Sequence, residues 1–104
     1  MKLINKMIYI MAKYKIKKDK LEEVKRAVIE FISAVKENEE GTLRYEAFQL
    51  KDSSLDFVHL MVFDDEKSRE MHSSSDYVKK FVETLYPCCE KEPEFIDLDK
   101  LNNG

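Results

Sequence analysis

Apolar side chains recur along this chain with two different spacings, and the order of the two spacings restricts the possible folds. In residues 7–16 they alternate with a second set of residues, which is typical of a β-strand. In residues 21–35 they recur at steps of three and four, which predicts an amphipathic helix of about 19 residues. Asp19 and Glu22 have the form of an N-terminal capping pair for this helix, and Gly41 is expected to close it in the left-handed conformation.

The period of two returns in residues 42–50 and 55–63, which flank a polar turn at residues 51–54. This pattern predicts an antiparallel β-hairpin. In its second strand Phe57, His59 and Met61 fall on one face, while the opposite face is also apolar. A small antiparallel sheet that is covered by helices on one side normally has one polar face, so the second face needs another cover.

Beyond the hairpin, acidic residues 64–66 precede a short helical segment that ends near His72. One of the last two serines of residues 73–75 is expected to cap a second helical segment, which Pro87 ends. Residues 94–101 are too few for another buried helix and predict a last strand.

The predicted order is strand, helix, strand, strand, helix, strand, which is the split βαβ order of ferredoxin-like α+β folds. A chain of 104 residues fits one domain, with a folded core at about residues 7–101. One layer of helices covers one sheet face. The other face would expose more apolar surface than soluble monomers usually tolerate, so we expect a homodimer in which two sheets pack together.

Composition argues against several classes of partner. The net charge is −3, with 18 basic and 21 acidic residues interspersed, and no basic stripe follows a path that could bind nucleic acid. No apolar run approaches the roughly 20 residues that a membrane span requires, and the expected location is the cytoplasm. The only two cysteines, Cys88 and Cys89, are adjacent and are expected to be reduced thiols.

Three segments in register resemble the antibiotic biosynthesis monooxygenase family of the dimeric α/β barrel superfamily. They are the strand from Met7 that runs into a helix, the motif Glu40-Gly-Thr-Leu-Arg-Tyr-Glu, and a strand followed by an acidic turn with His72, Ser75 and Phe81. The resemblance extends from Met7 to about residue 101.

The resemblance implies a dimeric barrel with a ligand pocket in each protomer, between the sheet and the short helical segment. Enzymes of the family oxidise phenolic or quinol-type substrates with dioxygen and without metal or flavin, so no cofactor is expected. Relatives that degrade haem resemble this chain less, because they carry a tryptophan where this chain has His72 and a later haem-ligating histidine. This chain has no tryptophan and offers only Phe81-Val82-Glu83 at the second place.

His72 is the principal candidate for catalysis, because an imidazole can accept a phenolic proton near neutral pH. Alternatively, His72 closes its helix as a structural latch that bonds a carbonyl or Ser75. His59 lies on an apolar strand face, where an imidazole either takes part in binding or is a structural group with satisfied hydrogen bonds. Neither histidine belongs to a set of residues with the spacing of a zinc site.

Five aromatic residues are candidates for the pocket wall, since flat rings suit a flat ligand, although each also suits a core. They are Tyr45, Phe57, Phe63, Tyr77 and Phe81. With His59 they form the predicted substrate-binding set, and His72 is the predicted proton acceptor. Together with these candidate residues, the resemblance implies a cofactor-independent monooxygenase acting on a small aromatic or quinol substrate. The alternative is a non-catalytic dimeric protein that binds a small molecule or serves in a stress response.

Overall fold

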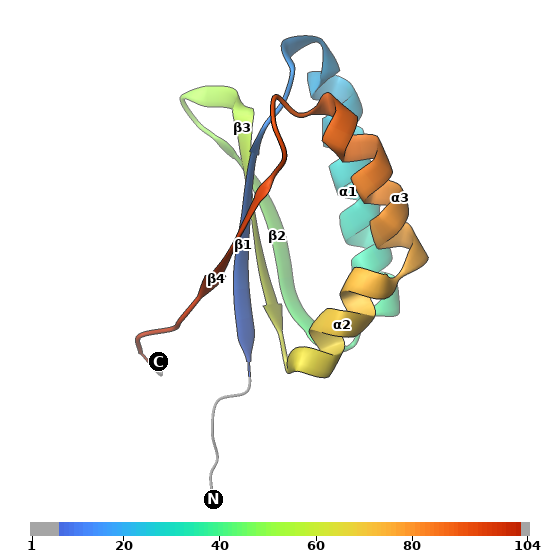
Figure 1. Ribbon diagram of the computed structural model, residues 1–104, viewed down its shortest axis with the longest axis vertical. Coiled ribbons are helices and arrows are strands. Elements are labelled where there is room, and N and C mark those ends of the chain that lie inside the picture. The colour runs from blue at the N-terminus through green and yellow to red at the C-terminus, as the bar shows by residue number, and fades with distance from the viewer. Residues whose placement is uncertain (1–6, 103–104) are drawn as a thin grey trace, which may run out of the picture.

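The computed structural model describes residues 7–102, which form a four-stranded antiparallel sheet and three α-helices. The predicted ferredoxin-like order is confirmed, and the strands lie in the order β2-β3-β1-β4 (Figure 1). The strands are β1 Ile8–Lys15, β2 Thr42–Leu50, β3 Ser53–Phe63 and β4 Glu94–Leu98. The helices are α1 Leu21–Asn38, α2 Glu66–Ser74 and α3 Asp76–Leu85, with 3₁₀ turns at Lys18–Lys20 (η1) and Tyr86–Cys88 (η2).

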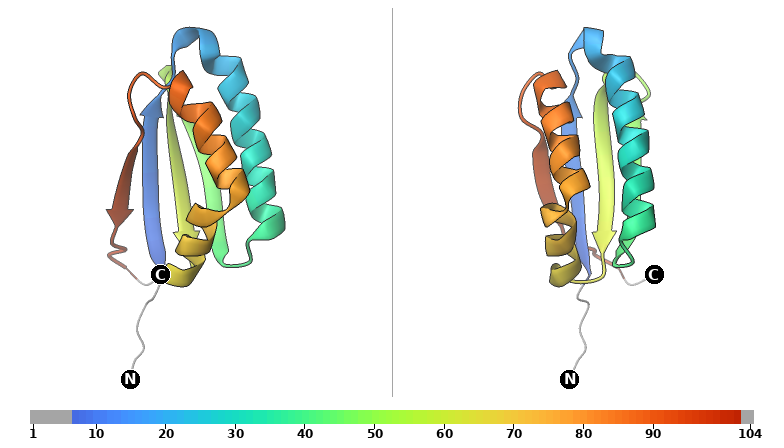
Figure 2. Two further views of the ribbon diagram at one scale, coloured as in Figure 1. Left: turned by 45° about the vertical axis from the view of Figure 1, so that its right-hand side comes forward. Right: turned by 90° about the vertical axis from the view of Figure 1, so that its right-hand side faces the viewer.

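The three helices lie on one face of the sheet and leave its other face open (Figure 2). Helix α1 buries one stripe, formed by Val24, Val28, Phe31 and Val35 at the predicted steps of three and four. Helix α3 buries Phe81 and Leu85 beside it. Because both helices press their apolar stripes onto the same sheet face, the core and any ligand cavity lie between these two layers.

Strand register decides which side chains enter this layer. Ala12 on β1 and Ala47 on β2 both pair with His59 on the central strand β3. Tyr14 pairs with Phe57, and Tyr45 pairs with Met61, so both tyrosines lie diagonally across from His59 on the helix-facing side.

Two predicted features of helix α1 are wrong. Asp19 lies inside the 3₁₀ turn η1, and no side chain caps the start of either η1 or α1. No glycine of the described residues has a positive φ, so Gly41 does not close α1 in the left-handed conformation. Helix α1 ends at Asn38, and the extended backbone of Glu39 donates its N–H to Val35 O. Gly41 is required for a steric reason instead: a Cβ there would lie 2.6 Å from Ser68 Cβ and closer still to its hydroxyl.

Other boundaries also differ from the prediction. The hairpin turn is shorter than expected, because β3 begins at Ser53 rather than at residue 55. Ser75 occupies the N-cap position of α3 but makes no cap hydrogen bond; its hydroxyl donates to His72 O at 2.8 Å, at the end of α2. Ser74 likewise donates to Met71 O. The predicted serine cap for α3 is therefore wrong, and these serines satisfy carbonyls at the end of α2. Strand β4 ends at Leu98, three residues early.

The open sheet face carries apolar side chains from all four strands. The most exposed are Phe48 and Leu50 on β2 and Ile96 and Leu98 on β4. Half-buried side chains continue the patch across the central strands, and they are Tyr9, Met11, Val58, Leu60 and Val62. No helix in the described part of the chain is long and apolar enough to cross a membrane.

Candidate active site

A cavity of about 270 Å³ lies between the sheet and the helices. Five of the seven predicted site residues line it: Tyr45, His59, Phe63, His72 and Phe81. The structure places the other two outside its lining. Phe57 stacks on Tyr14 with ring centroids 5.4 Å apart. Tyr77 lies beside Phe31 of α1, and its hydroxyl donates to Glu39. The alternation of β3 and the helical spacing of α2 and α3 thus bring most of the predicted set to one place.

His72 is held by a carboxylate that lies far away in the sequence. Its Nδ1 lies 2.9 Å from Glu39 Oε1 and 3.0 Å from Oε2, and both side chains are 9% exposed. Glu39 also accepts hydrogen bonds from the hydroxyls of Thr42 and Tyr77. Burial, followed by the hydrogen bond to Glu39, raises the pKa of Tyr77 to about 12, so this hydroxyl is a donor. Glu39 is thereby fixed by two donors besides His72.

The second nitrogen of His72 has a different environment. Within the described residues, His72 Nε2 has no hydrogen-bond partner, and no side-chain nitrogen or oxygen is both buried and unpaired. Nε2 is therefore accessible to solvent. Because His72 lines the cavity, the space next to Nε2 is the cavity itself. The imidazole ring lies among the rings of Phe31, Tyr45 and Phe63, at centroid distances of 5.2 to 5.9 Å. The predicted latch of His72 onto Ser75 occurs only through the His72 carbonyl, and its side chain bonds Glu39 instead.

His59 has no carboxylate partner and lies between two tyrosine hydroxyls. Its Nε2 lies 2.6 Å from Tyr14 Oη, and its Nδ1 lies 2.9 Å from Tyr45 Oη. Burial lowers the pKa of His59 to about 4, so the ring is neutral near pH 7. Burial also raises the pKa of both tyrosines well above the ordinary value. All three groups are therefore uncharged.

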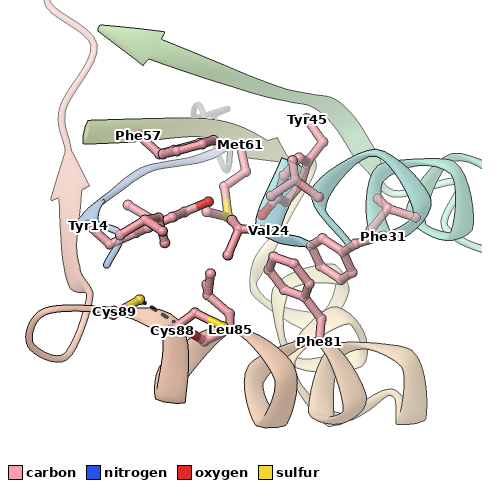
Figure 3. Packing of buried hydrophobic residues seen from close by; sticks show 14 of the residues in the cluster. Tyr14, Val24, Phe31, Tyr45, Phe57, Met61, Phe81, Leu85, Cys88 and Cys89 are labelled. Carbon is pink, nitrogen blue, oxygen red and sulfur yellow. Dashed lines mark hydrogen bonds between the residues drawn. The ribbon is translucent and has the colours of Figure 1, made fainter. Parts of the chain in front are cut away.

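Aromatic rings form much of the cavity wall. Phe31 of α1 and Phe81 of α3 stack at 4.2 Å between centroids with an interplanar angle of 2°. Figure 3 shows this stacked pair facing the sheet residues, while the hydroxyl of Tyr14 points into the layer between them. The exposed lining residues are Ser73 on α2 and Phe95 on β4, so the cavity opens between α2 and the β4 edge of the sheet. Arg69 stands at this opening and bonds Glu66 and Asp97.

The sequence model for antibiotic biosynthesis monooxygenases matches residues 7–84, which is 78 of the 104 residues. The chain belongs to this family. No curated protein matches the sequence.

Solved structures of similar fold span nearly the whole domain. A protein from Caulobacter crescentus that is provisionally described as an antibiotic biosynthesis monooxygenase is 23% identical, with a TM-score of 0.87 over 94% of this chain and 92% of that one. A protein from Bacteroides thetaiotaomicron with the same provisional description gives the same four values. A conserved protein from Methanosarcina mazei is 27% identical, with a TM-score of 0.85 over 92% of this chain and 94% of that one. The fold of this antibiotic biosynthesis monooxygenase family member is therefore common to proteins of bacteria and archaea.

Sequence reasoning missed three cavity-related residues of this family member: Tyr14, Phe31 and Glu39. Tyr14 lies on the buried face of β1, and a buried tyrosine needs a partner for its hydroxyl, so a histidine on the same sheet face was a usable signal. Phe31 falls on the predicted helix stripe but had been assigned only to the core. Glu39 gave no signal, because nothing local indicates that the end of α1 meets α2, 33 positions away.

The two cysteines are free and buried, as their predicted reduced state requires. Their Sγ atoms lie 3.4 Å from Thr84 O and Leu85 O respectively. Burial raises the pKa of Cys89 to about 11, so its unreactive thiol form dominates near neutral pH. Both side chains belong to the core of this monooxygenase-family domain.

Proposed function

We propose that this protein is a cofactor-independent monooxygenase that oxidises a small phenolic or quinol-type substrate with dioxygen, and that His72 accepts the substrate's proton. Family membership supports the reaction class. The observation that carries the role of His72 is its bond to Glu39 at the wall of an aromatic cavity. A carboxylate that orients one ring nitrogen leaves the other nitrogen as a proton acceptor.

The chemistry needs few protein groups. Removal of the phenolic proton makes the substrate ring electron-rich, and the substrate then supplies all the electrons that dioxygen takes up. At a ring carbon that bears hydrogen, one oxygen atom enters as a carbonyl and the other leaves in water, so a naphthol and dioxygen give a naphthoquinone and water. The negative charge of Glu39 stabilises the imidazolium that forms at His72, and the cavity shields the phenolate from water.

The size of the cavity restricts the substrate. About 270 Å³ lies just below the roughly 300–1,000 Å³ that is usual for ligand pockets. The rings of Phe31 and Phe81, which stack on each other in the cavity wall, suit a flat ring system. Both properties support a substrate of one or two rings.

The proposal includes a homodimer in which the open sheet faces of two protomers pack together. Four strands present apolar side chains there, Phe48 and Leu98 among them, and none of the helices in the described part of the chain covers them. Burial of this patch against a second copy removes it from water.

Oxygen uptake by the purified protein with a panel of naphthols, anthrones and quinols tests the catalytic role. We expect His72→Ala to lower the enzymatic rate by about 10²- to 10⁴-fold, the usual contribution of a positioned proton acceptor. Glu39→Gln is also expected to lower the rate, because it removes the negative charge that stabilises the imidazolium of His72. Glu40→Gln is the matched control, since Glu40 is the exposed neighbouring carboxylate.

Equal oxygen uptake by wild type and His72→Ala would remove the proton-accepting role. If wild type binds panel compounds and consumes no oxygen above the uncatalysed rate, the protein is a small-molecule binding protein. The same cavity suits both functions, and the Glu39–His72 pair is the feature that favours the enzyme.

A further inference from the structure

Tyr14, His59 and Tyr45 form a second polar group in the cavity wall, a row of three hydrogen-bonded side chains. All three are uncharged, whereas the Glu39–His72 pair includes a carboxylate. The members of the row come from three neighbouring strands, β1, β3 and β2, and all three line the cavity. His59 sits between Ala12 and Ala47, the residues directly across from it on the two flanking strands. Because these alanines are small, the tyrosines at the diagonal positions can reach over them to the imidazole.

The number of polar hydrogens on these three side chains decides what they offer to a ligand. A neutral imidazole carries one N–H and one acceptor nitrogen, and each tyrosine carries one O–H. The three groups thus hold three polar hydrogens, of which the two internal hydrogen bonds use two. One O–H remains on a terminal tyrosine, whichever tautomer His59 adopts. Within the described residues, neither tyrosine hydroxyl has a further hydrogen-bond partner.

The tautomer of His59 decides which tyrosine keeps the hydrogen. When Nδ1 carries the imidazole hydrogen, Nε2 is the acceptor and Tyr14 Oη donates to it over 2.6 Å. The contact of 2.9 Å between Nδ1 and Tyr45 Oη matches the usual length of an N–H donor bond. In this arrangement Tyr14 donates to His59, His59 donates to Tyr45, and the O–H of Tyr45 remains for a ligand.

Tyr45 also stands between the two histidines. Its ring centroid lies 5.6 Å from that of His59 and 5.9 Å from that of His72. A ligand oxygen that accepts from Tyr45 therefore lies close to the proposed proton acceptor.

We propose that Tyr45, oriented by His59 and Tyr14, donates a hydrogen bond to a carbonyl or phenolate oxygen of the ligand. The proposal rests on the proposed function for the ligand's ring system and adds to it that the ligand must carry an acceptor oxygen. A pure hydrocarbon of the same shape leaves the Tyr45 hydroxyl without a partner and binds more weakly.

Anaerobic binding of 1-tetralone, a two-ring ketone, and of tetralin, the hydrocarbon of the same shape, tests this on the wild-type protein. We expect the ketone to bind roughly 3- to 10-fold more tightly, the usual value of one net hydrogen bond. In infrared difference spectra, the carbonyl band of bound ¹³C-labelled 1-tetralone is expected at lower frequency than in an apolar solvent. Tyr45→Phe is expected to abolish the preference and move the band back.

Tyr9→Phe is the matched control, because Tyr9 lies on β1 with its side chain on the open sheet face, away from the cavity. Equal binding of ketone and hydrocarbon by wild type, an unshifted carbonyl band, or failure of both compounds to bind overturns the proposal. A band in Tyr45→Phe identical with that of wild type overturns the assignment to Tyr45. Because no turnover is needed, this test can fail or succeed independently of the oxygen-uptake test.

Discussion

His59 and His72 lie on the same side of the sheet but have different partners, and this difference divides the chemistry of the cavity between them. Both hydrogen-bond partners of His59 are neutral hydroxyls, and the ring stays uncharged near pH 7. It can therefore accept a hydrogen bond from one tyrosine and donate one to the other. His72 touches a carboxylate, which can stabilise the ring after it accepts a proton. We therefore propose different roles for the two histidines: His59 orients a hydrogen-bond donor, and His72 accepts a proton.

The low pKa of His59 predicts that the fold weakens in mild acid. Folding lowers this pKa from about 6.5 to about 4, so the unfolded chain binds the proton more tightly than the folded chain does. The free energy of unfolding is therefore unaffected by His59 above about pH 6.5 and falls as the pH is lowered from there to about 4. The loss over this window is about 3 kcal/mol.

Urea unfolding of wild type and His59→Gln at about pH 7 and pH 5 measures this contribution. The variant is expected to lose less stability between the two values than wild type does. NMR titration gives a second readout that requires no variant, because the chain has only two histidines. A ring of His59 that becomes protonated near pH 6.5 in the folded protein would contradict the prediction.

At the scale of single residues, the sequence predicted which side chains share a face of one strand or one helix. It did not predict contacts between segments that lie far apart in the sequence. The alternation of β3 predicted that Phe57, His59 and Met61 share one face, and the structure buries all three. The partners of both histidines were missed, since Tyr14 lies 45 positions from His59 and Glu39 lies 33 positions from His72. Such contacts depend on how the elements pack, which no local pattern encodes.

At the scale of elements, the turn between α1 and β2 brings the end of α1 close to α2 beside the site. Gly41 lies against Ser68 of α2, and its carbonyl accepts from Asp64 N at 2.8 Å. Glu39 lies two residues before Gly41, and His72 lies one helical turn after Ser68. The close approach at Gly41 therefore sets the distance between the carboxylate and the imidazole.

We expect Gly41→Ala to destabilise the protein by about 1–3 kcal/mol, because the new Cβ would lie 2.6 Å from Ser68 Cβ and must displace α2. The same displacement should lower oxygen uptake by moving His72 away from Glu39. Thermal or urea unfolding of the variant measures the first effect.

Ser68→Gly provides the control, since it removes the side chain that the new Cβ meets. The double variant Gly41→Ala/Ser68→Gly should be more stable than the sum of the two single changes predicts. Strict additivity would show that the Gly41–Ser68 approach does not explain the cost.

The elements themselves were predictable, and their ends were not. Hydrophobic periodicity identified the helices α1 and α3 and the first three strands, because burial of one face imposes it directly. The short helix α2 was predicted from the acidic residues before it, and β4 from the shortness of its segment. Capping failed at Asp19 and at Ser75, where the chain satisfies helix ends by a 3₁₀ turn or by bonding backward to the previous helix. Gly41 was correctly marked as special, but for the wrong reason: steric contact with α2 rather than backbone conformation.

For the whole molecule, the open sheet face follows from the same periodicity that predicted the fold. Strands with two apolar faces and helices on one side leave a surface that needs a partner. The described chain supplies no helix for it, and its outward-facing residues, such as Phe48 and Ile96, stay exposed. We propose a second copy of the chain as this partner, because a symmetric dimer brings the same apolar patch from both protomers together.

This argument predicts a dimer in analytical ultracentrifugation, which Phe48→Glu should dissociate. Phe48 is 49% exposed on the open face, so in the dimer the substitution buries a carboxylate near an apolar patch and should weaken association by about 2 kcal/mol or more. Ile29→Glu is the matched control, since Ile29 is 67% exposed on α1, in the layer on the other side of the sheet. A monomeric wild type would contradict the sheet-on-sheet dimer, and equal dissociation by both substitutions would place the interface elsewhere. Because the proposed catalytic groups all lie on the helix side, Phe48→Glu should separate association from chemistry. A monomer that keeps its oxygen uptake would show that each protomer carries a complete site.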